Sequence, residues 1–233
     1  MSSAERIGIL GGTFDPVHAG HIAVAQAARH ALGLRQVWLM PSRVPPHRHG
    51  PQASVYHRFA MVAMAALSVE GLLASDADLE TPGPSYTIEL LERLHVEGYR
   101  PSQIVFITGA DAFADIATWR RYPALLDAAH FAVVSRPRQR VEAMRERLPE
   151  LSEHFVLAET NEARARLDGP QPAVFLIDAP TPDVSSTNIR QRLQTGTSIV
   201  GLVPADVERY IRRHGLYAAE IPTAGHLHEH TAQ

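Results

Sequence analysis

A glycine-rich turn at residues 11–21 constrains the fold of this chain more than any other stretch. It follows an apolar run at 7–10 and precedes a segment whose apolar residues recur at helical spacing as far as Leu32, so it predicts a strand, a turn and a helix in succession. Such turns hold phosphates in α/β proteins, because backbone N–H groups and the positive end of the helix dipole face the ligand.

The residue types of this turn suit a ligand better than a buried core. Gly11 and Gly12 permit a positive φ and a close approach of a ligand to the backbone. His18 and His21 lie three residues apart at the start of the helix, so both imidazoles can face the same side. Composition alone leaves open a glycine turn with two exposed histidines. A metal site is less favoured, because no Cys or carboxylate stands at matching spacing.

Short apolar runs alternate with helical patterns along the rest of the chain. We expect strands at 36–40, 72–74, 104–107, 131–134 and 174–177, and helices at 55–68, 85–96, 186–194 and 205–214. The alternation predicts an α/β fold with a doubly wound (Rossmann-like) parallel sheet in a single domain. Ligands of such sheets bind at the carboxyl ends of the strands. The segments 11–21, 41–48, 108–111 and 135–137 each follow a strand and should therefore converge on one face.

The remaining segments set the limits of this domain. The charged stretch 139–170 is expected to form a helix plus a surface excursion. We assign residues 1–217 to the domain and residues 218–233 to a flexible tail. That tail carries His226, His228 and His230, whose alternation is more typical of a solvated end than of a metal site.

Composition narrows the class of protein. The 233 residues, 45% of them hydrophobic, suffice for one sizeable core, and the absence of Cys excludes disulfides and zinc–thiolate sites. No apolar signal core stands at the amino terminus, and no apolar run approaches membrane-spanning length. The formal charge of −3 gives no reason to expect nucleic-acid binding. We expect a cytoplasmic protein with small-molecule substrates, no nucleic-acid partner and no membrane, and we leave open whether it is a homo-oligomer.

A second pattern, Val-Ser-Ser-Thr-Asn-Ile-Arg, stands at residues 184–190. A serine before an apolar-periodic segment signals a helix N-cap, and a capped helix with a surface arginine would account for it. The alternative is a second helix N-terminus where hydroxyl groups and Arg190 meet a polyphosphate. The pattern alone favours neither.

Three further segments also have simple structural explanations. Pro-Pro-His-Arg at 45–48 could be a connector, Gly-Pro-Ser-Tyr-Thr at 83–87 a turn and helix cap, and Gly-Ala-Asp-Ala at 109–112 another cap. Trp119 could be a core residue. An aromatic ring beside an oriented set of donors is nevertheless a sensible reader of a flat, anionic ring.

The two main motifs together resemble one superfamily. Gly-Gly-Thr-Phe-Asp-Pro-x-His-x-Gly-His and Ser-Ser-Thr-x-Ile-Arg, in this order and about 170 residues apart, are similar to the paired signatures of the α/β-phosphodiesterase nucleotidyltransferases. Within that superfamily the chain looks most like the bacterial nicotinate-nucleotide adenylyltransferases. Phosphopantetheine adenylyltransferase is the alternative, but those chains are typically shorter and lack the 83–87 loop and the tryptophan. A non-catalytic nucleotide-binding regulator would be expected to have lost a motif histidine or Arg190, and all are present.

The resemblance implies an activity and a set of site residues. It implies transfer of the adenylyl group of ATP to nicotinate mononucleotide, forming deamido-NAD and pyrophosphate in NAD biosynthesis, with Mg²⁺ accompanying ATP and no protein side chain assigned as a metal ligand. Catalytic roles fall to His18, His21 and Arg190. The residues implied for ATP are Gly11, Gly12, Thr13, Phe14, His18, Gly20, His21, Gly109, Asp111, Arg136, Ser185, Ser186, Thr187, Ile189 and Arg190. Those implied for nicotinate mononucleotide are Asp15, His47, Arg48, Ser85, Tyr86, Thr87 and Trp119.

Overall fold

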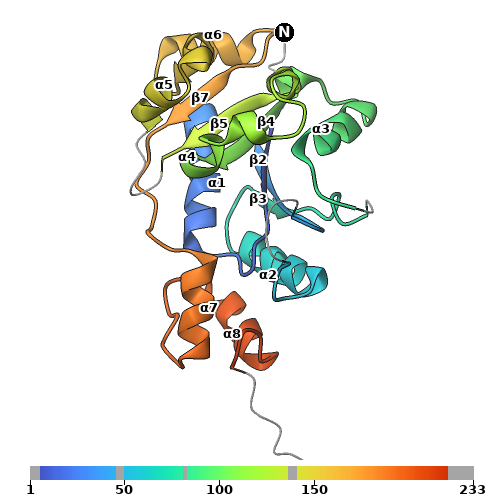
Figure 1. Cartoon of the computed structure of the whole chain (residues 1–233), viewed down its shortest axis with the longest axis vertical. Coiled ribbons are helices and arrows are strands. Elements are labelled where there is room, and N and C mark those ends of the chain that lie inside the picture. The colour runs from blue at the N-terminus through green and yellow to red at the C-terminus, as the bar shows by residue number, and fades with distance from the viewer. Residues whose placement is uncertain (1–5, 46–49, 81–82, 136–140, 220–233) are drawn as a thin grey trace, which may run out of the picture.

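The computed structural model describes residues 6–45, 50–80, 83–135 and 141–219. They form a seven-stranded sheet, in the order β3-β2-β1-β4-β5-β7-β6, in which every pairing is parallel. Helices cover the two faces of the sheet (Figure 1). The prediction of a doubly wound parallel sheet is confirmed.

The elements follow one another as the alternation predicts. The strands are β1 (Ile7–Gly12), β2 (Gln36–Pro41), β3 (Leu72–Ala74), β4 (Ile104–Gly109), β5 (His130–Val134), β6 (Phe155–Leu157) and β7 (Val174–Ile177). The helices are α1 (Ala19–Leu32), α2 (Val55–Leu67), α3 (Thr87–Val96), α4 (Ala110–Phe113), α5 (Met144–Arg147), α6 (Asn161–Asp168), α7 (Ser186–Gln194) and α8 (Ala205–Arg213). Short 3₁₀ turns occur at η1 (Pro101–Gln103), η2 (Ile116–Thr118), η3 (Ala124–Asp127), η4 (Val141–Ala143) and η5 (Pro149–His154).

The direction of winding reverses between β1 and β4. β1 pairs with β2 on one side and with β4 on the other, so the chain builds one half of the sheet, returns and builds the second half. At such a switch point the connections leave the two strand ends in opposite directions and open a crevice. The carboxyl ends of β1 and β4 are therefore where a ligand site is expected.

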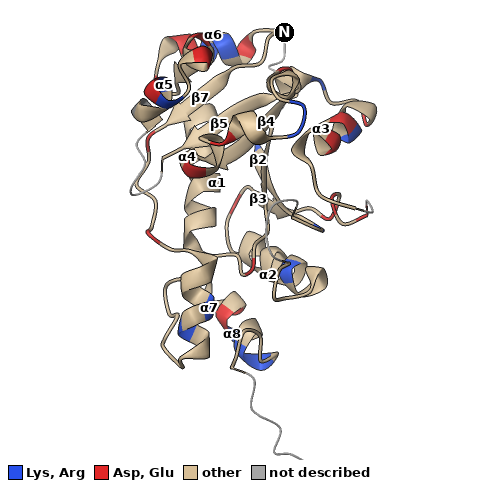
Figure 2. Ribbon diagram, in the orientation of Figure 1, with Lys and Arg blue, Asp and Glu red and all other residues tan. Residues whose placement is uncertain are grey.

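Two hydrophobic clusters fill the two faces of the sheet. Alternate residues of each central strand point to opposite faces: Leu10 and Ile107 join the cluster beneath α1, α2 and α8, while Ile9 and Phe106 join the cluster beneath α3. The strands carry no charged side chains, as Figure 2 shows, which is typical of parallel strands covered on both sides. The helices α7 and α8 lie together at the end of the molecule near the start of α1 (Figure 1).

One strand was not predicted. The stretch expected to be a helix and a surface excursion contains β6, which pairs with β7 as the edge strand, as well as α5 and α6. β6 is only three residues long and stands between charged segments, so it has no alternating pattern to reveal it. The helix expected from residue 85 begins at Thr87 instead, with Tyr86 as its N-cap.

Some expectations fall outside the described part of the chain. Of the predicted tail only residues 218 and 219 are described, and the three tail histidines are not. Within the described ranges, no helix is both long enough and apolar enough to cross a bilayer.

A buried histidine begins β5. The side chain of His130 is completely buried, and its Nδ1 accepts a hydrogen bond from the backbone N–H of Ala173 at 3.0 Å. Burial lowers the pKa of His130 to about 4, and the positive charges of Arg6 and Arg166 act in the same direction. The native protein therefore keeps this imidazole neutral under mildly acidic conditions.

We predict that His130 makes stability depend on pH. An ordinary histidine has a pKa of about 6.5. Below that pH, His130 therefore binds a proton in the unfolded chain but stays neutral in the native chain until the pH nears its lowered pKa. The free energy of unfolding should be undiminished above that pH and should fall by about 2 kcal/mol between pH 7 and pH 5 through this residue. Urea unfolding at both pH values measures the loss, which His130→Gln should abolish. His154→Gln, at an exposed position, is the control; an equal loss in wild type and His130→Gln would contradict the prediction.

Candidate active site

A cavity of about 460 Å³ opens at the carboxyl ends of β1, β2 and β4, at the switch point of the sheet. Its volume is within the usual range for small-molecule sites. Its walls come from the turn after β1, the segment after β2, the start of α3, the segment after β4 and the start of α7. The predicted site residues in these walls are Gly11, Gly12, Thr13, Phe14, His21, Ser85, Tyr86, Thr87, Trp119 and Ser186.

Other predicted residues lie behind or beside this wall. They are Asp15, His18, Gly20, Gly109, Asp111, Ser185, Thr187, Ile189 and Arg190. Three predicted residues, His47, Arg48 and Arg136, lie outside the described residues. The expected convergence of the segments after β1, β2 and β4 on one face is confirmed. Of the fourth segment, 135–137, only Ser135 is described, and it is not among the residues that line the cavity.

The small size of Gly12 leaves room for the ring of Phe14. Gly11 and Gly12 belong to β1, and the residue of the turn with a positive φ is Phe14, at 49°. Neither glycine uses the positive φ that its residue type permits. A Cβ at Gly12 would lie 3.2 Å from the ring of Phe14, which is tighter than an ordinary contact, so a larger residue would fit only if that ring moved by a few tenths of an ångström. The Phe14 ring in turn meets the imidazole of His21 edge-on, with centroids 4.9 Å apart.

The two motif histidines form a stacked pair at the start of α1. Their ring centroids lie 3.7 Å apart, with 26° between the ring planes. The backbone N–H of His18 donates to Nδ1 of His21 at 3.2 Å. A neutral imidazole whose Nδ1 accepts carries its proton on Nε2, so His21 can present an N–H donor from the cavity wall. His18 is 3% exposed and supports this ring from behind.

The second motif begins α7 as a capped helix. The hydroxyl of Ser185 accepts the N–H of Asn188 at 3.2 Å, as the N-cap pattern predicts. Ile189 is completely buried in the cluster on the α1 and α2 face, so its side chain anchors α7 in the core. The side chain expected at the ATP site from its place in the motif is thus a core residue.

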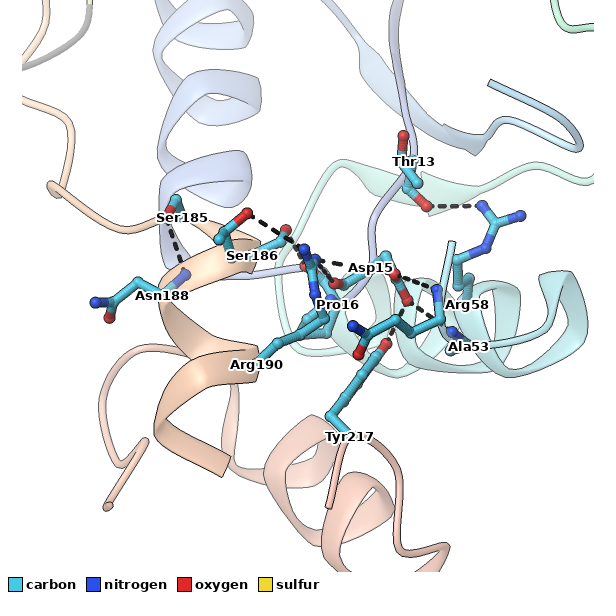
Figure 3. A network of polar contacts seen from close by, with 12 residues as sticks. Thr13, Asp15, Pro16, Ala53, Arg58, Ser185, Ser186, Asn188, Arg190 and Tyr217 are labelled. Carbon is cyan, nitrogen blue, oxygen red and sulfur yellow. Dashed lines mark hydrogen bonds and ion pairs between the residues drawn. The ribbon is translucent and has the colours of Figure 1, made fainter. Parts of the chain in front are cut away.

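The second motif, at 184–190, is hydrogen-bonded directly to the first, at 11–21 (Figure 3). Ser186 Oγ donates to the backbone carbonyl of Pro16 at 2.9 Å, and Arg190 Nη1 donates to the backbone carbonyl of Asp15 at 2.7 Å. Arg190 Nη2 also donates to Thr187 Oγ1 at 3.2 Å. The two motifs, which are far apart in the sequence, therefore form a single structure.

The carboxylate of Asp15 lies beneath the turn rather than on the cavity wall. It is 4% exposed, and Oδ1 accepts the hydroxyl of Tyr217 at 2.7 Å and the N–H of Ala53 at 3.1 Å. Oδ2 accepts the N–H of Gln52 at 2.8 Å. The sequence suggested contact with nicotinate mononucleotide, whereas the structure engages both oxygens within the protein.

A buried arginine on α2 supports the same turn. Arg58 is completely buried, and Nη1 donates to the carbonyls of Thr13 and Ser42 at 2.7 and 2.8 Å. Nη2 donates to the carbonyl of Arg43 at 3.2 Å. Burial lowers the pKa of Arg58, and the negative charge of Asp15 opposes this shift.

Arg58 and Tyr217 were not predicted from the sequence. A signal for Arg58 existed, because it stands at helical spacing with Met61, Val62 and Ala65 on the buried stripe of α2. A charged residue on an apolar stripe needs partners within the protein. Tyr217 had no comparable signal, since its partner stands 202 residues away.

The far wall of the cavity joins the segment after β2 to the start of α3. The N–H of Ser85 donates to the carbonyl of Val44 at 2.9 Å, and the hydroxyl of Ser85 accepts the N–H of Val44 at 3.3 Å. α3 then begins at Thr87, and its N-cap residue Tyr86 makes no side-chain cap. The positive end of this helix therefore faces the cavity.

Aromatic side chains stand beside this helix start. Trp119 is half-buried and packs edge-on against Phe106, with centroids 6.0 Å apart. The guanidinium of Arg120 lies 4.4 Å from the centroid of the Tyr86 ring. Arg120 also forms an ion pair with Glu89 at 3.1 Å, so its charge is already partly balanced. The aromatic wall and the helix N-terminus together suit a flat ring that carries negative charge.

The sequence of this chain is similar to a known family and to named proteins within it. A family model described as cytidylyltransferase-like matches residues 9–192. A protein of Desulfatibacillum aliphaticivorans, named a probable nicotinate-nucleotide adenylyltransferase, is 39% identical over 221 residues, covering 91% of this chain and 99% of that protein. A protein of the same name from Pseudomonas fluorescens is 39% identical over 215 residues, covering 92% and 98% of the two chains.

Comparison with solved structures extends this likeness to the fold. The Plasmodium falciparum nicotinic acid mononucleotide adenylyltransferase complexed with NaAD superimposes with a TM-score of 0.66 at 19% identity, covering 91% of this chain and 97% of that one. Its complex with APC has a TM-score of 0.65 at 18% identity, with the same coverage. At this identity the likeness shows a shared fold.

We predict that Arg58→Lys lowers the free energy of unfolding by about 2–4 kcal/mol, because an ammonium group cannot present the planar set of donors that the three carbonyls accept. Chemical denaturation measures the change. Arg209→Lys on the surface of α8 is the control, with an expected change within about 0.5 kcal/mol. Equal effects at the two positions would show that the buried contacts of Arg58 contribute little.

Proposed function

This chain belongs to the cytidylyltransferase-like family and, within it, to the nicotinate-nucleotide adenylyltransferases, and we propose that its cavity joins ATP to nicotinate mononucleotide. The 5′-phosphate oxygen of the mononucleotide attacks the α-phosphorus of ATP. A new P–O bond forms, the bond from the α-phosphorus to the αβ-bridging oxygen breaks, and deamido-NAD and pyrophosphate result. The observation that carries the proposal is the hydrogen bonding of the two motif segments to each other beside one cavity.

We assign the triphosphate to the side of the cavity formed by the two motifs. His21 would donate from Nε2 toward the phosphates, supported by His18, and Arg190 would neutralise charge on the leaving pyrophosphate. α7 offers further support, since it contains arginines but no acidic side chain (Figure 2). The hydroxyl groups of Ser186 and Thr187, and the backbone of the glycine turn, complete the proposed ATP site.

We assign nicotinate mononucleotide to the opposite side. The start of α3 at Thr87 would meet the pyridine carboxylate, and the rings of Tyr86 and Trp119 would hold the pyridine. The exposed Asp111 stays a prediction for a nucleotide ribose. The roles of His47 and Arg48 at nicotinate mononucleotide, and of Arg136 at the phosphates or the adenine of ATP, also stay predictions.

The proposed reaction needs no general base. The attacking phosphate oxygen is already ionised at neutral pH, so the protein has only to place two polyanions in line and to stabilise charge at the α-phosphate. The site is suited to this task, because the groups around it are fixed N–H and O–H donors held by hydrogen bonds to the backbone.

We propose Mg²⁺ as the divalent cation that enters with ATP as part of the substrate. Nucleotidyltransferases of this kind generally use a divalent metal with ATP. Among the described residues, no group of three or more His, Asp or Glu side chains could hold a metal ion. Phosphate oxygens and water would therefore supply most of its ligands, as Mg²⁺ commonly accepts.

We further propose that residues 1–217 form one nucleotidyltransferase domain acting in the cytoplasm. The continuous core supports this extent, since Tyr217 packs in the same cluster as Leu10 of β1. The formal charge of −3 supports soluble nucleotides rather than nucleic acid as partners.

The reaction is tested by pyrophosphate release from ATP and Mg²⁺. We expect turnover with nicotinate mononucleotide and much less with nicotinamide mononucleotide, because the start of α3 favours a negative charge on the ring. Phosphopantetheine serves as the third acceptor. Preferred turnover with phosphopantetheine would overturn the acceptor assignment, and ATP binding without turnover of any acceptor would favour a binding protein on the same fold.

We predict that His21→Ala lowers kcat about 100-fold or more while the KM for ATP changes only a few-fold, because the donor acts mainly on charge that develops in the transition state. His18→Ala should have the same type of effect through loss of the stacked support. Steady-state kinetics with His154→Ala as the exposed control measures this. A loss confined to KM would contradict a transition-state role.

A further inference from the structure

The hydroxyl of Tyr217 reaches the active-site turn from the end of the described chain. Tyr217 follows α8, and its hydroxyl donates to Oδ1 of Asp15 at 2.7 Å across 202 residues of sequence (Figure 3). Its side chain is buried. Burial and the neighbouring carboxylate of Asp15 raise the pKa of Tyr217 above its ordinary value, so the phenol remains a protonated donor.

Tyr217 is one of the hydrogen-bond donors that the buried carboxylate of Asp15 needs. A buried carboxylate is costly unless hydrogen bonds replace its water shell. Gln52 and Ala53 supply backbone N–H groups, and Arg190 Nη1 lies 3.9 Å from Oδ2. The Tyr217 hydroxyl makes the shortest of the hydrogen bonds to this carboxylate that the structure shows.

The position of Asp15 determines the position of Arg190. The backbone carbonyl of Asp15 accepts Nη1 of Arg190, and Thr187 accepts Nη2, so two of the five guanidinium N–H donors fix the plane of the group. The next carbonyl, of Pro16, accepts the hydroxyl of Ser186. A shift of the Asp15 side chain would thus be transmitted most directly to Arg190, which bonds to the carbonyl of Asp15 itself, whereas Ser186 bonds to that of the next residue.

We propose that Tyr217 is a positioning residue of the adenylyl transfer, which acts through Asp15 to hold Arg190 in its working orientation. The inference rests on the proposed function, since Arg190 is assigned there to the leaving pyrophosphate. Tyr217 itself touches no substrate. Asp15 likewise serves as the link between the two, rather than as a ligand of the mononucleotide.

A purely structural role, attaching α8 to the body of the protein, is the competing explanation. α8 has other attachments, because Val207 and Ile211 are completely buried and Tyr210 Oη lies 2.9 Å from Nδ1 of His57 on α2. Tyr210 thus offers a matched control, since it is a second tyrosine from the same end of the chain whose hydroxyl bonds outside the site.

The kinetic test compares Tyr217→Phe with Tyr210→Phe, which each remove one oxygen atom. We expect Tyr217→Phe to lower kcat about tenfold with little change in either KM, because a small misplacement of a catalytic group is costly. Tyr210→Phe should leave kcat within about twofold of wild type.

In an Arg190→Ala background, Tyr217→Phe should change kcat by less than about twofold, because the group it positions is gone. An unchanged kcat in Tyr217→Phe, or a tenfold loss in both backgrounds, would overturn the proposal.

A second measurement is independent of turnover. The guanidinium N–H signals of Arg190, assigned in NMR spectra by their absence in Arg190→Ala, report how firmly the group is held without any substrate. We expect them to broaden or shift in Tyr217→Phe and to stay unchanged in Tyr210→Phe. Unchanged Arg190 signals in Tyr217→Phe would overturn the positioning role, whereas a wild-type protein that is inactive with nicotinate mononucleotide would instead overturn the proposed function.

Discussion

The buried carboxylate of Asp15 is the interaction on which the rest of this site depends. Its side chain ties the turn after β1 to the segment before α2 and to Tyr217 in the segment that follows α8, while its backbone carbonyl holds Arg190 of α7. Segments from both ends of the sequence thus meet at one residue. Because a buried negative charge is tolerated only where donors surround it, these contacts depend on one another.

Arg58 complements this arrangement from the other side of the turn. Its guanidinium donates to the backbone carbonyls of Thr13, Ser42 and Arg43. This cation therefore supports the cavity from below and is not part of the cavity wall. A buried cation and a buried anion below one turn are costly to desolvate, which argues that they contribute order more than net stability. That order matters for a reaction in which the protein supplies position and charge but no base.

The fold explains why these groups can meet. The reversal of winding between β1 and β4 leaves a crevice where the turn after β1 and the segment after β4 diverge, and the walls of the cavity are the segments that leave the strand ends there. The stacked histidines lie on one side of it and the start of α3 with its aromatic rings on the other. Two anionic substrates can therefore approach from opposite sides of a rigid sheet edge.

The sequence by itself determined the alternation of strands and helices, the parallel sheet and the two motif segments, because apolar periodicity and helix caps are local properties. It could not reveal β6, whose three residues form a strand only by pairing with β7. It could not distinguish Asp15 from the cavity-lining residues around it, or show that Ile189 is a core residue, since burial depends on what packs above a side chain. Only the tertiary structure decided that Tyr217 joins the site, because a hydrogen bond across 202 residues leaves no local pattern in the chain.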